Sequence, residues 1–156
     1  MFKFLFIIIL VIIPIKIGID IQNKMRERKK NLHELHNFFL SVKREVIFSK
    51  RKLSEIFEDN LELLSGKLRE DFENQIESLS DIGLYDFFDR LDIDKRDKKI
   101  LLTFAEGISK SEDSHDNLLA CISENYEEAN SAYNQNGKLY RSIGLASGLI
   151  LGILFI

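Results

Sequence analysis

Apolar and polar residues are strongly segregated along the chain. Residues 4–15 form an unbroken apolar run, FLFIIILVIIPI, and residues 143–156 form a second one, IGLASGLILGILFI. Between the two runs the chain is rich in charge, and its apolar positions recur every three or four residues. This pattern predicts an apolar segment at each end of the chain and amphipathic helices between them.

The two apolar ends are predicted to be transmembrane helices. As a helix, Phe2–Ile19 is roughly 27 Å long, close to the ~30 Å hydrocarbon core of a bilayer, if Lys16 extends its ammonium group to the headgroups. We therefore predict an N-terminal anchor over residues 1–21, a central helical domain over residues 22–141 and a C-terminal anchor over residues 142–156.

Each anchor has an alternative interpretation. A cleaved signal peptide would also begin with Lys3 and an apolar run, but no small-residue cleavage site follows. The C-terminal run makes roughly 21 Å of helix, which is short for a span, so a buried core helix is the alternative there. Because this run has no polar face, which a core helix of so small a domain normally keeps, we favour an anchor.

Positive charge is concentrated beside the first apolar run. Residues 21–52 carry ten basic and three acidic side chains, a net +7, whereas residues 53–136 carry eight basic and twenty-one acidic ones, a net −13. Basic residues stay on the cytoplasmic side of a membrane. We therefore expect a cytoplasmic central domain whose basic end contacts anionic membrane lipid and does not bind nucleic acid.

Three glycines in the C-terminal run, Gly144, Gly148 and Gly152, recur every four residues. This spacing puts them on one face of a helix, where the lack of side chains lets another backbone approach closely. We predict a helix–helix contact in the membrane at these glycines, with the first anchor or with a partner. The alternative is that glycine is simply common in membrane helices.

The central domain is predicted to be all-α. Two apolar stripes of period 3.5 predict two long helices that pack on each other in antiparallel orientation. The first stripe consists of Leu32, Leu35, Phe39, Val42 and Val46, and the second of Leu118, Ile122, Asn125, Ala129, Ala132, Asn136, Leu139 and Ile143. Four shorter helices are predicted over Ser54–Ser65, Leu68–Leu79, Leu84–Leu91 and Asp94–Ile108. Gly66 and Gly83 act as turn signals between them.

The sequence displays no recognisable catalytic motif. His33 and His36 could share a helix face, but no carboxylate or third histidine completes a metal site, so we interpret them as solvated side chains. The segment from Asp89 to Asp97 lacks the glycine and the terminal glutamate of a calcium loop. Cys121 has no base nearby in the helical frame and is interpreted as a packed thiol. We therefore predict that the protein is not an enzyme and uses no metal or cofactor.

One motif points to a known family. Residues 138–144 read KLYRSIG and lead into the glycine-rich terminal run. This stretch resembles the K-x-Y-R-S-L-G run of stage III sporulation protein AB, a family of endospore-forming bacteria. The matching positions are Lys138, Tyr140, Arg141, Ser142 and Gly144.

Two further stretches are similar to patterns of the same family. Val42–Ile56 resembles an E-I-x-Y segment followed by P-L-x-E-A, with Lys52 in place of the usual proline. Phe104–Asp116 resembles F-G-x-x-L-G-x-S-D-x-E-D-Q, with Ala105 and Ser109 in place of the two glycines. With the first motif, the resemblance extends over essentially the whole chain.

The resemblance implies a function that the residue pattern alone does not provide. That family is required for sporulation and belongs to a secretion-like channel between the mother cell and the forespore. Its cytoplasmic domain is similar to the helical platform protein of type II secretion. The resemblance therefore implies a platform in the mother-cell membrane around the forespore. This platform would dock the channel ATPase, stage III sporulation protein AA, and contact the other channel subunits. It leaves open whether the chain forms a homo-oligomer.

A second hypothesis keeps the membrane attachment and drops the channel. In it the chain is a membrane-tethered helical adaptor or regulatory protein whose acidic central domain binds a cytoplasmic partner. Expression in growing cells, and partner binding that does not depend on the channel genes, would favour this hypothesis.

Overall fold

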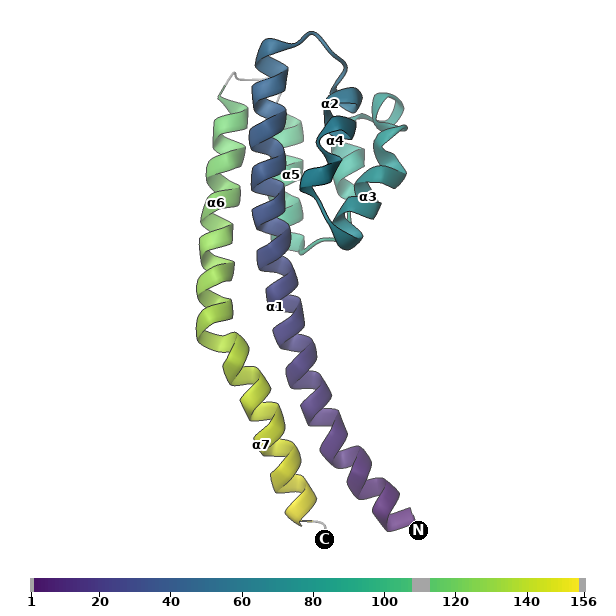
Figure 1. Cartoon of the computed structure of the whole chain (residues 1–156), viewed down its shortest axis with the longest axis vertical. Coiled ribbons are helices and arrows are strands. Elements are labelled where there is room, and N and C mark those ends of the chain that lie inside the picture. The colour runs from purple at the N-terminus through teal and green to yellow at the C-terminus, as the bar shows by residue number, and fades with distance from the viewer. Residues whose placement is uncertain (1, 108–112, 155–156) are drawn as a thin grey trace. The chain divides into compact units, whose positions relative to one another are not determined.

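Helices account for all regular secondary structure in the described part of this computed structural model, residues 2–107 and 113–154; for residues 2–7 and 10 the backbone alone is described. The elements, labelled in Figure 1, are α1 (Phe2–Phe48), α2 (Leu53–Asp59), the 3₁₀ turn η1 (Leu61–Leu63), α3 (Gly66–Ile76), α4 (Leu79–Asp89), α5 (Lys95–Gly107), α6 (Ser114–Ala132), the π-helical turn η2 (Tyr133–Gly137) and α7 (Lys138–Leu154). The all-α prediction is confirmed.

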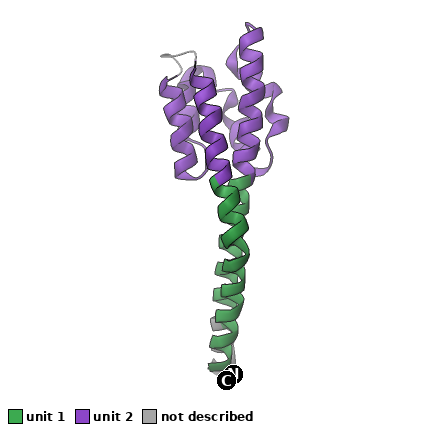
Figure 2. Cartoon of the chain, turned by 90° about the vertical axis from the view of Figure 1, so that its left-hand side faces the viewer, with its two compact units in different colours: residues 1–29, 128–156 green, residues 30–127 purple. Residues whose placement is uncertain are grey.

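The chain divides into two compact units, coloured separately in Figure 2. Unit 1 consists of residues 1–29 and 128–156, and unit 2 consists of residues 30–127. Helices α1 and α6 each contribute residues to both units. The division predicted at residues 21 and 141 was based on polarity and stays a prediction.

Unit 2 is built around a cluster of phenylalanines. Phe38 and Phe39 of α1 are fully buried, and the ring of Phe38 meets those of Phe57 and Phe72 with centroids 5.1 Å apart in each pair. The rings cross at steep angles, the edge-to-face arrangement that aromatic quadrupoles favour. The cluster also includes Phe87, Phe88 and Phe104. One ring cluster therefore joins α1 to α2, α3, α4 and α5.

Polar contacts fix the turns around this core. The buried Asn60 amide, at the end of α2, donates to the Glu45 carboxylate and to the Ile56 carbonyl, each at 2.8 Å. The Glu34 carboxylate of α1 accepts hydrogen bonds from the Ser65 amide at 3.0 Å and the Ser65 hydroxyl at 2.6 Å. Ser65 is the N-cap of α3, so α1 sets where that helix begins.

The short helices overlap their predicted positions, but α2 ends at Asp59 where Ser65 was predicted, and α4 begins at Leu79 where Leu84 was predicted. Gly66 has φ of 56° at the start of α3, and Gly83 has φ of 78° within α4, both in the left-handed region that favours glycine. Gly83 breaks the helical geometry where the sequence signalled a turn. The predicted end of the fourth short helix, Ile108, lies outside the described residues.

Unit 1 is an antiparallel pair formed by α1 with the chain from Glu128 to the end of α7. Arg28 pairs with Glu128 at 3.9 Å, the Lys29 ammonium lies 5.5 Å from the centroid of the Tyr133 ring, and Gly18 lies against Gly144. From Gly18 to Arg28 along α1, the contact partner moves back along the chain from Gly144 to Glu128. The two helical segments therefore run in opposite directions, which confirms the predicted antiparallel orientation within this unit.

The π-helical turn η2 changes which face of the second helix is buried. The predicted stripe continues to Leu139 and Ile143, but these side chains are 52% and 53% exposed. The buried positions are instead Gly137, one residue after the predicted Asn136, and Gly144, one residue after the predicted Ile143. A π-turn closes its hydrogen bond over five residues instead of four, so it adds one residue to the period. The stripe prediction is therefore wrong beyond η2.

The two transmembrane helices predicted at the ends are not borne out. No helix of the described residues is both long enough and apolar enough to cross a membrane. Helix α7 has 17 residues. In α1, side chains are described from Ile8 apart from Leu10, and an 18-residue stretch from Ile8 already includes Lys16, Asp20 and Lys24. On this finding the prediction of two terminal transmembrane helices is wrong.

Candidate functional site

The three glycines of the C-terminal run lie at the helix contact of unit 1. Gly144, Gly148 and Gly152 are all buried on α7. A β-carbon at Gly144 would lie 2.7 Å from the Pro14 carbonyl oxygen, and one at Gly148 would lie 2.7 Å from the Val11 carbonyl oxygen. The two backbones are therefore as close as glycine allows.

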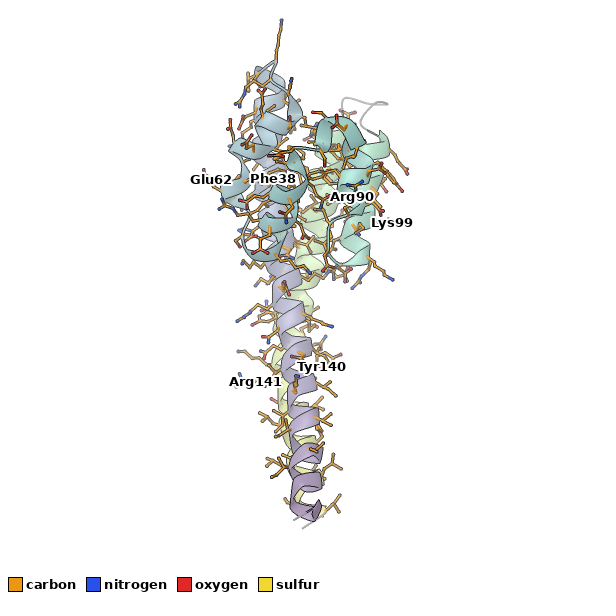
Figure 3. The ribbon with its side chains drawn as sticks, turned by 90° about the vertical axis from the view of Figure 1, so that its right-hand side faces the viewer. Phe38, Glu62, Arg90, Lys99, Tyr140 and Arg141 are labelled. Atoms are coloured by element: carbon orange, nitrogen blue, oxygen red, sulfur yellow. The ribbon has the colours of Figure 1, made fainter. Side chains whose placement is uncertain are left out.

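The family-like motif at residues 138–144 lies on the first turns of α7. The Ser142 hydroxyl donates to the Lys138 carbonyl at 3.0 Å, within the helix. The Tyr140 carbonyl lies 2.6 Å from the place where a β-carbon of Gly18 would stand, so this residue contacts α1 through its backbone. Arg141 is exposed, and Figure 3 labels it together with Tyr140. The motif thus combines a close backbone contact with an outward cation.

Of the two histidines of α1, His33 is exposed and His36 is half-buried. The His33 ring nitrogen Nε2 lies 3.3 Å from the Asn37 amide, and its ring centroid lies 5.5 Å from that of Tyr126. The described residues contain no group of three or more histidine, cysteine, aspartate and glutamate side chains placed to hold a metal ion.

The acidic segment Asp89–Asp97 forms the corner between α4 and α5. Asp92 pairs with Lys67 of α3, whose ammonium lowers the pKa of that carboxyl, and the Asp92 amide donates to Asp71 at 2.9 Å. The Asp94 carboxylate accepts from the Arg96 amide at 2.9 Å, at the start of α5. These carboxylates therefore form hydrogen bonds and an ion pair between neighbouring segments at this corner.

An apolar groove lies between α5 and α6 in unit 2. Its volume is about 370 Å³. Ile100, Phe104 and Leu118 supply its apolar lining, and Arg96 and Lys99 supply positive charge; Figure 3 labels Lys99. The other lining residues are Thr103, Gly107, Ser114, Asn117 and Cys121. Such a groove can accept an apolar side chain that has an acidic neighbour.

The apolar residues of this groove were recognised in the sequence as helix-packing positions, but the groove itself was not predicted. Ile100 and Phe104 belong to the predicted amphipathic helix, and Leu118 belongs to the second stripe. Which pair of helices leaves a gap depends on packing between distant segments. Cys121 was interpreted as a packed thiol, but it is exposed and lines the groove, so that interpretation is wrong. Ser111 and Glu112 of the third family-like stretch lie outside the described residues.

Comparison with known proteins identifies the family. The family model described as stage III sporulation protein AB matches residues 3–156. Neither the curated proteins nor the solved structures gave a significant match. Because the family model covers nearly the whole chain, the chain belongs to the stage III sporulation protein AB family.

Proposed function

We propose that this chain is a structural platform of the secretion-like channel between the mother cell and the forespore, and that it docks the channel ATPase, stage III sporulation protein AA. The observation that carries the proposal is the family match over residues 3–156. This family is a sporulation family and is not a known enzyme family. Membership is consistent with a role in sporulation, and the channel and the ATPase are the proposed details.

The architecture of unit 2 supports a platform. Its ring cluster joins five helices, and buried Asn60 and half-buried Glu34 fix two of its turns. A core of interlocked aromatic rings has low compressibility and transmits strain. A body of this kind can pass force or register from a motor to neighbouring subunits without deforming.

The groove between α5 and α6 is the surface that we propose for the ATPase. Residues 53–136 carry a net charge of −13, yet Arg96 and Lys99 line the groove beside an apolar floor. Positive charge beside apolar surface, within this acidic stretch of the chain, complements an amphipathic segment with acidic residues. We therefore propose that the ATPase presents such a segment to the groove.

The mother-cell membrane around the forespore is the proposed location. Unit 1 exposes many large apolar side chains, and extensive exposed apolar surface marks a site of interaction with a membrane or another protein. They are Ile8, Ile9, Ile12, Ile13, Ile17, Ile19, Leu139, Ile143, Leu145, Leu149, Ile150, Ile153 and Leu154. This exposed apolar surface supports the proposal that the chain is associated with a membrane.

Two experiments in sporulating cells test the proposal. A strain that lacks the chain should complete engulfment poorly and yield few heat-resistant spores. A tagged chain should co-purify the ATPase and other channel subunits. Normal spores from the deletion strain would refute the role in sporulation. If the tagged chain recovered its partners equally well without the channel genes, the adaptor hypothesis would replace the platform.

A pair of matched substitutions tests the groove. Asn117→Glu puts a carboxylate at the exposed lining of the groove, where it would repel the acidic residues of the proposed segment, whereas Ser123→Glu adds the same charge at an exposed site of α6 that does not line the groove. We expect the first variant to lose most of the co-purified ATPase and the second to keep it. Equal recovery with both variants would show that the ATPase does not use the groove.

A further inference from the structure

A second, polar recess lies in unit 1, outside the groove and the glycine contact. Its volume is about 420 Å³. Helix α1 contributes Ile19, Gln22, Asn23 and Arg26, η2 contributes Tyr133, and α7 contributes Arg141. The six residues thus come from the two antiparallel helical segments of unit 1 and surround one hollow.

The side chains of this recess can donate hydrogen bonds but carry no negative charge. Arg26 and Arg141 are guanidinium groups, Gln22 and Asn23 are carboxamides, and Tyr133 has a phenolic hydroxyl. None of the six is acidic. The nearby Arg28 is different because it pairs with Glu128 at 3.9 Å.

Neither arginine of the recess has a carboxylate within ion-pair distance among the residues that the structure describes. Two guanidinium groups that share one hollow repel each other, and an anion between them removes that cost. The planar guanidinium offers paired N–H donors that match the oxygens of a phosphate group. The charge and the donors of the recess therefore both suit a phosphate.

The π-helical turn η2 explains how the recess is formed. Tyr133 and Arg141 are eight residues apart, whereas two turns of α-helix take about 7.2 residues. The extra residue of a π-turn raises that spacing to about 8, which brings the two side chains onto the same face. In an uninterrupted α-helix, residues eight apart are turned about 80° from each other around the axis. π-Turns of this kind occur frequently at functional sites.

We propose that this recess binds a phosphate group, either the headgroup phosphate of an anionic lipid or that of a soluble phosphate compound. Arg26 and Arg141 hold the phosphate oxygens from the two helices. Gln22, Asn23 and the Tyr133 hydroxyl supply neutral donors. The Lys29 ammonium, 5.5 Å from the centroid of the Tyr133 ring, helps to hold that ring in place.

Paired substitutions in the purified full-length chain test the site. The recess variant is Arg26→Ala with Arg141→Ala. The control is Lys24→Ala with Lys138→Ala, which removes the same charge from the same two helices at exposed positions that do not line the recess. A third variant, Arg26→Lys with Arg141→Lys, keeps the charge and removes the planar fork. Circular dichroism checks that each variant is folded.

The probes are vesicles of phosphatidylglycerol in phosphatidylcholine, vesicles of phosphatidylcholine alone, and inorganic phosphate. We expect the recess variant to bind the anionic vesicles, the phosphate or both about tenfold or more weakly than the natural chain, as expected for lost charge-assisted hydrogen bonds. The control should bind within about threefold of the natural chain, because exposed charges are screened by salt. The lysine variant should lie between the two.

The probes also distinguish the source of the phosphate. Binding to anionic vesicles alone identifies a lipid headgroup, and binding of inorganic phosphate with the same dependence on the arginines identifies a soluble phosphate compound. Equal losses in the recess variant and the control would overturn the proposal, because general attraction to a basic surface would then explain the binding. No binding of any probe by the folded natural chain would overturn it as well. If the alanine variant does not fold, full binding by the lysine variant contradicts the geometry.

Discussion

In unit 2 the helices are held apart by large aromatic side chains that interlock, whereas in unit 1 two helices meet at glycines with their backbones almost in contact. Phe38, Phe57 and Phe72 have ring centroids 5.1 to 6.2 Å apart. At Gly144 the β-carbon of any other residue would lie 2.7 Å from a carbonyl oxygen of α1. In unit 2 side chains fill the space between the helices, whereas in unit 1 there is no space for a side chain at the contact.

This difference teaches where each unit tolerates change. A ring cluster loses stability when a side chain is removed, because a cavity remains. A glycine contact loses stability when a side chain is added, because the backbones must move apart. The two units should therefore respond to opposite kinds of substitution, and the following predictions test that contrast.

The largest effect is expected from Phe72→Ala. This side chain is 0% exposed and contacts three other rings of the cluster, so its truncation should lower the free energy of unfolding by about 3–5 kcal/mol. Urea unfolding followed by circular dichroism measures the change. The matched control is Phe48→Ala, because Phe48 is 88% exposed and its truncation should change stability little. Similar losses in both variants would contradict the ring cluster as the core.

The next effect is expected from Gly148→Ile. A side chain here meets the Val11 carbonyl oxygen and the Ile15 side chain, so we expect a loss of about 1–3 kcal/mol in the stability of the helix pair. Amide hydrogen exchange along α7 reports this loss within unit 1. Ala146→Ile places the same residue at an exposed position of the same helix and should leave exchange nearly unchanged. Unaltered exchange in Gly148→Ile would show that the close contact does not stabilise the pair.

A smaller effect is expected from Glu34→Ala. The change removes the carboxylate that accepts two hydrogen bonds from Ser65, and donors left without their acceptor in a half-buried site cost about 1–2 kcal/mol. Thermal unfolding of unit 2 measures it. Glu62→Ala, at the exposed residue labelled in Figure 3, removes the same charge without a capping contact and should have little effect. A larger loss with Glu62→Ala would remove the proposed role of Glu34.

The smallest effect concerns pH. Burial lowers the pKa of His115 below its ordinary value, with a further contribution from Lys43, and its ring packs against Phe104 at 5.0 Å. The unfolded chain therefore takes up this proton at higher pH than the folded chain. Stability should fall as the pH drops below about 6.5, until it reaches the folded pKa. His115→Leu should flatten this part of the stability–pH curve, and an unchanged slope would exclude His115 as its source.

Much of unit 2 could be predicted because its helices follow local rules. The period of Leu32, Leu35 and Phe39 predicts the buried face of α1, and all three are buried. Gly83 marks a break because a positive φ is costly for other residues. Apolar spacing and turn glycines act on residues within about one helical turn, so they can be recognised in a single sequence.

The features that could not be predicted depend on exceptions to those rules or on distant contacts. The one-residue shift at η2 exposes Leu139 and buries Gly144, and no residue type marks a π-turn as proline marks a kink. The groove and the polar recess each require two segments far apart in the chain. Arg141 belongs to the family-like motif, whereas Arg26 is only one of the ten basic residues between positions 21 and 52, and no sequence pattern relates the two.

The proposed role as a docking platform for a sporulation ATPase is tested most directly by binding between the two purified proteins. Isothermal titration calorimetry of the full-length chain with stage III sporulation protein AA should show saturable binding that Asn117→Glu weakens and Ser123→Glu preserves. The absence of binding between two folded proteins would contradict the account.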